Sequence, residues 1–83
     1  METILQMIQI FLDDENPDAF GFSIQLEDML YDYYDEMKNE NLAVTEILNE
    51  ELPDICASYE QGVDLKKFKE QIRREYMRAV EWM

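Results

Sequence analysis

The sequence predicts an all-α fold, a small antiparallel four-helix bundle whose third helix is kinked or broken near Pro53. Three observations support this prediction. Only two glycines and two prolines interrupt the 83 residues, which favours long regular elements. Apolar residues recur at intervals of three and four, as on one face of a helix, and no stretch shows the sustained alternation of a strand. Short connections between such helices favour antiparallel neighbours.

A polar turn separates the first two predicted helices. The first covers residues 2–13, and its apolar face consists of Ile4, Leu5, Ile8, Phe11 and Leu12. The second begins at residues 16–18, where Asn-Pro-Asp supplies a cap, a proline in the first helical position and an acid in the first turn. It continues to about Asn39, and its predicted buried face consists of Ala19, Phe20, Ser23, Leu26, Leu30, Tyr33, Tyr34 and Met37.

The third predicted helix, residues 43–59, contains a proline. Pro53 interrupts the most regular apolar stripe of the sequence, which consists of Val44, Ile47, Leu48, Leu52, Ile55, Cys56 and Tyr59. Proline removes one backbone donor and crowds the preceding turn, so we expect a kink or a break near Glu51–Leu52. The stripe stays in phase across the proline, which favours a kink.

The fourth predicted helix runs from Asp64 to the C-terminus. Gly62 is expected to end the preceding helix, and Asp64 to cap this one. Val63 and Phe68 are placed for a hydrophobic staple across the cap. The expected buried face consists of Leu65, Phe68, Ile72, Tyr76, Ala79 and Val80.

The composition predicts one folded domain, residues 1–83, in the cytoplasm. Hydrophobic residues make up 47% of the chain and aromatic residues 12%, which disordered acidic chains lack, so the net charge of -13 does not indicate disorder. The single cysteine, Cys56, rules out an intramolecular disulfide and fits a reducing compartment. The N-terminus lacks a secretory signal, and no stretch approaches a membrane span, so we expect no membrane partner.

The residue types argue against catalysis. The chain has no histidine, which removes the commonest general base and the commonest metal ligand. Cys56 lies on an apolar stripe and is expected to be a small core residue. The acids at residues 13–18 lack the ligand spacing of a calcium loop, and neither a glycine-rich phosphate loop nor a zinc-type cysteine pair is present. We therefore expect a protein that is not an enzyme and takes no cofactor or metal.

The negative charge is concentrated in the first sixty residues. Residues 1–60 contain 16 acids and one base, Lys38, whereas residues 61–83 contain four acids and six bases. The acids of the second and third predicted helices recur at helical spacing and form two stripes. Like charges four residues apart destabilise a helix by about 0.2–0.5 kcal/mol per pair. One base among sixty residues is hard to attribute to solubility, so we assign the stripes a function.

The predicted function is the binding of a basic protein. A negative field steers a cationic partner, and carboxylates along a helix can take the places of phosphates, since arginine binds both groups in the same bidentate way. Tyr31 is expected to be partly exposed among the acids. The predicted partner-binding residues are Asp28, Tyr31, Asp32, Asp35, Glu36, Glu46, Glu50, Glu51 and Asp54. Direct binding of nucleic acid is not expected, and the bases of the last helix could serve only to pair with neighbouring acids.

The layout of the chain resembles that of bacterial immunity proteins of the colicin D type, including those of contact-dependent growth inhibition systems. The stretches that carry the resemblance are Ile8-x-x-Phe11-Leu12, Ala19-Phe20, Ile47-Leu48-Asn49-Glu50-Glu51-Leu52, Ala57-Ser58-Tyr59-Glu60 and Asp64-Leu65. The resemblance implies an inhibitor that binds a cognate toxin domain, commonly a tRNA-cleaving nuclease. Its acidic side chains would cover the basic active site of that nuclease.

Two other hypotheses fit the same composition. A phage protein that mimics nucleic acid and inhibits a restriction or CRISPR nuclease would carry the same charge. A non-enzymatic helical adapter, or an oligomerising bundle, would instead bind mainly through apolar surface, with an affinity nearly independent of salt.

Overall fold

The computed structural model describes residues 1–62 and 64–83, and over these residues the chain forms five helices and no strand. The helices are α1 (Glu2–Asp13), α2 (Ala19–Asp32), α3 (Tyr34–Glu40), α4 (Leu42–Glu60) and α5 (Leu65–Val80). The predicted all-α class is confirmed. The predicted number of four helices is wrong, because the second predicted helix is divided into α2 and α3.

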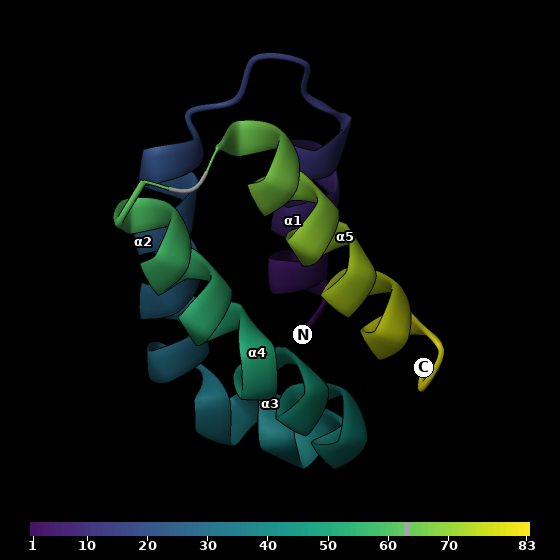
Figure 1. Cartoon of the computed structure of the whole chain (residues 1–83). Helices are drawn as coiled ribbons and strands as arrows, with labels where there is room; N and C mark the ends of the chain where they lie inside the picture. The colour runs from purple at the N-terminus through teal and green to yellow at the C-terminus, as the bar shows by residue number, and fades with distance from the viewer. Residues whose placement is uncertain (63) are drawn as a thin grey trace.

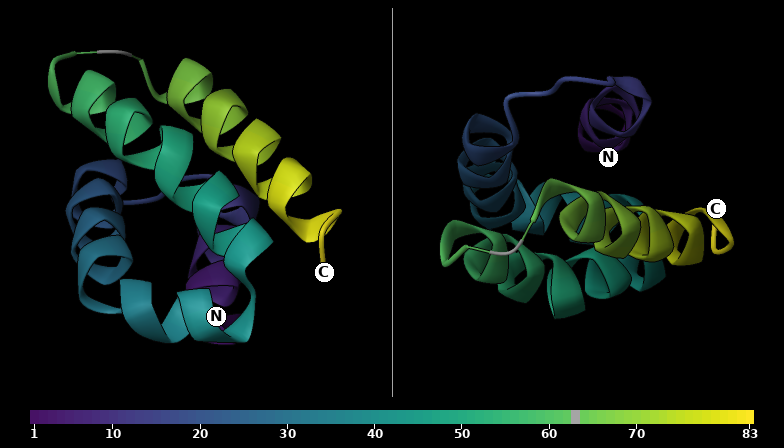
Figure 2. Two further views of the ribbon diagram at one scale, coloured as in Figure 1. Left: turned by 90° about the horizontal axis from the view of Figure 1, so that it is seen from below. Right: turned by 45° about the horizontal axis from the view of Figure 1, so that its top comes forward.

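The helices form two layers. α4 and α5 lie antiparallel in one layer, and α1 and α2 lie behind them (Figure 1). The short α3 crosses one end of the molecule and connects the two layers (Figure 2). α4 is the central element, since it packs against α2, α3 and α5, while α1 packs against α2 and α5.

The break between α2 and α3 falls at Tyr33, where the backbone leaves the helical region with φ -105° and ψ 12°. No proline or glycine marks this position. A straight helix from residue 18 to 39 would be about 33 Å long at ~1.5 Å per residue. That length equals the longest dimension of the molecule, 33 Å. Turning the chain at Tyr33 instead brings Met37 into the core, where it is 1% exposed.

Pro53 does not break its helix. α4 continues from Leu42 to Glu60 with Pro53 inside it, which excludes the break, and the kink favoured by the sequence stays a prediction. Proline deprives the Asn49 carbonyl of its helical donor. Leu48 and Leu52, before the proline, and Cys56, after it, are all fully buried against neighbouring helices. This packing on both sides of Pro53 opposes a break at the missing hydrogen bond.

Three helix starts are capped by side chains. Asp18 Oδ1 accepts from the Gly21 amide at 3.1 Å, Asn41 Oδ1 from the Val44 amide at 3.1 Å, and Asp64 Oδ1 from the Lys67 amide at 3.0 Å. The prediction for Asp64 is confirmed, while the cap of α2 is Asp18 and not Asn16. A Cβ atom at position 21 would meet the Asp18 carboxylate, so a larger residue there would force this capping side chain to shift.

The end of α4 follows the prediction for Gly62. This residue has a φ of +113°, a left-handed conformation that glycine adopts without strain. The predicted staple between Val63 and Phe68 falls partly outside the described residues, because Val63 is not among them.

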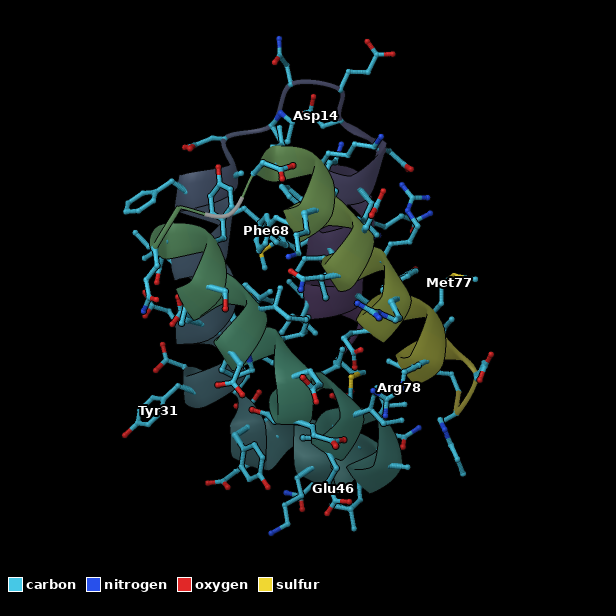
Figure 3. All side chains as sticks on the ribbon, viewed as in Figure 1. Asp14, Tyr31, Glu46, Phe68, Met77 and Arg78 are labelled. Carbon is cyan, nitrogen blue, oxygen red and sulfur yellow. The ribbon has the colours of Figure 1, made fainter. Side chains whose placement is uncertain are left out.

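Aromatic rings join the two layers at the core. Phe11 of α1 and Phe22 of α2 stack with their centroids 3.9 Å apart. Phe68 of α5, fully buried, meets the Phe11 ring edge-on at 5.5 Å and stacks on Tyr59 of α4 at 4.3 Å. The cluster therefore ties α1, α2, α4 and α5 together, and Phe68 lies at its centre (Figure 3).

The buried face of α2 differs from the prediction at its aromatic residues. Phe20, predicted to be buried, is 55% exposed, and Phe22 fills the core in its place. Tyr33 is 46% exposed because the chain turns at this residue. Across the described part of the chain, none of the helices combines the length and the apolar character needed to cross a membrane.

Candidate partner-binding surface

All nine predicted partner-binding residues are exposed, but they belong to three helices that face different ways. Asp28, Tyr31 and Asp32 lie on α2, and Asp35 and Glu36 lie in the first turn of α3. The other four, Glu46, Glu50, Glu51 and Asp54, lie on α4. The predicted continuous stripe from Asp28 to Glu36 on one helix is therefore wrong, because the turn at Tyr33 separates its two halves.

The structure brings part of the α2 and α3 group together. Tyr31 and Asp35 line one open hollow with Tyr34 and Asn49, and the buried Leu30 forms part of its lining. Tyr31 is 85% exposed, more than the partial exposure predicted for it. The ammonium group of Lys38 lies 6.0 Å from the centre of the Tyr34 ring, so this region already places a cation near an aromatic face.

The α4 acids lie in a different electrostatic environment. A carboxylate oxygen of Glu50 is 3.8 Å from the Arg78 guanidinium, and Glu51 lines a groove between α4 and α5 with Arg74 and Arg78. Tyr31 projects from the α2 side of the molecule, whereas Glu46 lies on α4 near the end closed by α3 (Figure 3). The two predicted stripes thus do not form one continuous surface, and α5 partly neutralises the second.

The basic residues of α5 are mostly free of acidic partners. Arg78 donates to the buried Glu75 carboxylate at 2.6 Å, and Lys69 donates to the Asp14 backbone carbonyl. Within the described residues, Arg78 is the only α5 base that forms an ion pair with a carboxylate. Pairing with neighbouring acids therefore accounts for one of the six bases.

Two acids that sequence reasoning missed meet between α2 and α4. The fully buried Ser23 hydroxyl donates to the Phe20 carbonyl at 2.9 Å and lies 3.3 Å from Glu60 Oε1. Partial burial, a hydrogen bond with Glu60 and the negative charge of that group together raise the pKa of Glu27 above its ordinary value. Glu27 and Glu60 are far apart in the sequence and share no motif, so only the packing of α2 on α4 places them together.

Cys56 lies beneath this pair and is fully buried. Burial, with a smaller contribution from the charges of Glu27 and Glu60, raises the pKa of the Cys56 thiol to about 12. The thiol therefore stays protonated at neutral pH and is a poor nucleophile. The predicted position of Cys56 in the core is confirmed.

Sequence reasoning also missed two apolar residues on the surface of α2. Phe20 and Ile24, one helical turn apart, are 55% and 42% exposed. Their positions follow from the choice of Phe22 as the core aromatic residue, and the sequence pattern allows either phenylalanine to fill that place.

No group of three or more histidine, cysteine, aspartate or glutamate side chains among residues 1–62 and 64–83 is arranged to hold a metal ion. Comparison of the chain with protein-family models, with curated proteins and with solved structures found no match.

Proposed function

We propose that this protein is an immunity protein, which binds a cognate nuclease toxin domain and covers its basic active site with acidic side chains. The observation that carries the proposal is the uncompensated charge of α2 and α3. Asp28, Asp32, Asp35 and Glu36 are all exposed, and within the described part of the chain none of them forms an ion pair. Asp35 and Glu36 lie in the first turn of α3, where acids favour the helix N-terminus, but Asp28 and Asp32 have no such role on α2, so a cationic partner is the best explanation for the exposed group.

The physical chemistry of such a surface suits a nuclease active site. A nuclease that binds tRNA phosphates presents arginine and lysine side chains, and carboxylates pair with these groups in the geometry of phosphates. The negative field of the whole molecule raises the rate of encounter, and salt screens that field. Tyr31, 85% exposed beside Asp32, adds an aromatic group of the kind that is enriched at protein interfaces.

The α2–α3 acids are expected to contribute more than the α4 acids. Arg78 lies near Glu50, and Arg74 and Arg78 share a groove with Glu51. A partner that approached this part of α4 would meet a mixed field, whereas Asp28 to Glu36 present a uniformly negative one apart from Lys38 nearby. We therefore place the centre of the interface on α2 and α3.

The test is co-expression with a toxin C-terminal domain encoded beside the gene for this chain. We expect the protein to protect cells from that domain and to form a complex with the purified domain. Failure of both protection and complex formation would overturn the proposal.

Charge reversal locates the interface. The combined variant Asp32→Lys, Asp35→Lys and Glu36→Lys should slow association by about tenfold or more at low salt, because it replaces steering attraction with repulsion. The matched variant Lys66→Glu, Arg73→Glu and Arg74→Glu changes three charges on α5 and should leave protection intact. Circular dichroism should show both variants folded. The reverse result, loss only with the α5 variant, would place the interface on the basic helix.

A further inference from the structure

The outer face of α2 carries a line of apolar side chains that the fold leaves uncovered. Phe20, Ile24 and Tyr31 are 55%, 42% and 85% exposed. They stand at positions i, i+4 and i+11, which fall on one side of a helix. The same helix buries Phe22, Leu26 and Leu30 on its opposite side, so α2 is apolar on two faces. An apolar line of this kind on one helix face is a candidate interaction surface.

Acidic residues border this line on both sides. Asp28 and Asp32, one turn apart, follow one edge of it along the helix. Glu27 and Glu60 follow the other edge, where α4 packs against α2 and the Ser23 hydroxyl lies 3.3 Å from the Glu60 carboxylate. We call this surface the α2 seam. It consists of Phe20, Ile24 and Tyr31 together with Glu27, Asp28, Asp32 and Glu60.

An apolar line flanked by two rows of acids has the pattern of the contact face of one helix in a coiled-coil pair. In paired helices the apolar line meets the apolar line of the partner, and the flanking charges choose a partner of opposite sign. We propose that the α2 seam docks a basic amphipathic helix, with apolar side chains against Phe20, Ile24 and Tyr31 and with lysine or arginine opposite both acidic rows. This inference rests on the proposed function for the basic character of the partner, and it adds the element of the partner that α2 recognises.

The dimensions and the charge decide what occupies the seam. Phe20 to Tyr31 spans about 16 Å, or three helical turns, which is enough for a short recognition helix. A second copy of this chain is a poor occupant. Its basic helix, α5, already buries its apolar face in the core through Phe68, Ile72 and Ala79, and the two copies would each carry a net charge of -13.

The test uses three synthetic peptides of about 15 residues, long enough for roughly four helical turns. The first carries leucine at helical spacing with lysine elsewhere. The second keeps the leucines and replaces lysine with glutamate, and the third keeps the lysines and replaces leucine with glutamine. Each is titrated into the isotope-labelled full chain, and the backbone amide signals are followed by NMR. We expect the leucine–lysine peptide to bind most tightly and to shift the α2 residues bordering the seam.

Substitutions in the protein provide the matched comparison. The variant Phe20→Ser and Ile24→Ser should weaken binding of the leucine–lysine peptide by about tenfold or more, the loss expected when interface anchors are removed. Met77→Ser is the control, because Met77 is 56% exposed on α5 and lies on the side of the molecule opposite Tyr31 (Figure 3). Equal binding of the lysine–glutamine peptide, or no loss in the Phe20 and Ile24 variant, would overturn the inference.

The result is separable from that of the co-expression assay. If the toxin domain is bound and the Phe20→Ser and Ile24→Ser variant protects cells as well as the original chain, the seam is not the interface and the proposed function stands. If no toxin is neutralised but the peptide binds the seam, the proposed function fails and the docking mode stands.

Discussion

The outer face of α2 and the paired helices α4 and α5 use their polar residues in opposite ways. On α4 and α5 the buried Glu75 pairs with Arg78 at 2.6 Å, and Arg78 also lies 3.8 Å from Glu50. On the outer face of α2, Asp28 and Asp32 are exposed on the same helix as Phe20 and Tyr31, and neither pairs with a base among the described residues. Both regions are helical and charged, yet among the described residues only α4 and α5 pair some of their acids with a base.

This comparison distinguishes charged residues that the fold needs from charged residues that it does not need. A carboxylate that is buried requires a cation nearby, because an unpaired buried charge is costly. Exposed acids have no such requirement, and crowding them on one surface costs stability through mutual repulsion. Asp35 and Glu36 offset part of that cost in the first turn of α3, where acids favour the helix N-terminus, but Asp28 and Asp32 have no such role on α2, which supports an external partner for these two residues.

The largest expected effect compares the same substitution in the core and on the α2 face. Phe68→Ala should lower the free energy of unfolding by about 3–5 kcal/mol, because it removes the ring that contacts Phe11, Phe22 and Tyr59. Phe20→Ala, at an exposed position, should change it by no more than about 0.5 kcal/mol. Urea unfolding followed by circular dichroism measures both. Similar losses in the two variants would mean that Phe20 is part of the core and not of a docking face.

An intermediate effect is expected at the α4–α5 ion pairs. Arg78→Met leaves Glu75 without its nearest cation and should cost about 1–2 kcal/mol, less than for a fully buried pair because Arg78 is 46% exposed. Arg74→Met, which removes a base that pairs with no acid among the described residues, should cost no more than about 0.5 kcal/mol. Thermal unfolding at neutral pH distinguishes the two variants. Equal, small losses would show that the α5 bases are interchangeable and that the contrast with α2 is weaker.

The smallest effect concerns pH and the Glu27–Glu60 pair. The pKa of Glu27 is raised above its ordinary value of 4.5 in the folded chain, chiefly by burial and then by Glu60, so the folded state binds this proton more tightly than the unfolded state. Its stabilising contribution is present at acidic pH and is lost as the pH rises through the raised pKa. Glu27→Gln should therefore raise the melting temperature at neutral pH and confer no such advantage below pH 4.5.

The control for this prediction is Glu46→Gln, which removes one negative charge from an exposed position on α4. The melting temperatures of both variants are measured across the acidic pH range. They distinguish the effect of the Glu27–Glu60 pair from the general repulsion in a highly charged chain. If the melting temperature at neutral pH rises as much in Glu46→Gln as in Glu27→Gln, the Glu27–Glu60 pair has no special effect.

Local residue patterns predicted most helix positions correctly because short-range physics determines them. The apolar spacing in residues 2–13 and 43–59 gave helices whose bounds differ from α1 and α4 by at most one residue, and Asp64 and Gly62 act as the predicted cap and terminator. The exposure of Tyr31 was predicted because the nearby acids Asp28, Asp32 and Asp35 mark a solvent-facing part of the sequence. These features depend only on residues within a few positions of each other.

The errors arose where distant helices decide the outcome. Nothing near Tyr33 marks the end of α2, which follows from the burial of Met37 under α4. Pro53 favours a break by its local chemistry, and the packing of Leu52 and Cys56 on both sides of it keeps α4 continuous. Phe22 fills the core instead of Phe20 because it stacks on Phe11 of another helix.

The sequence by itself therefore determined that this protein is helical, strongly acidic in its first sixty residues and furnished with exposed carboxylates on its second helix. Only the tertiary structure decided that Glu50 of α4 is compensated, because Arg78 of α5 reaches it through the packing of the two helices, whereas the pair of Arg78 with Glu75 is local to α5. It also decided that Phe20 and Ile24 face solvent between two acidic rows, since one of those rows includes Glu60 from a different helix. Charge is a property of the chain, whereas a docking surface depends on what the fold leaves uncovered.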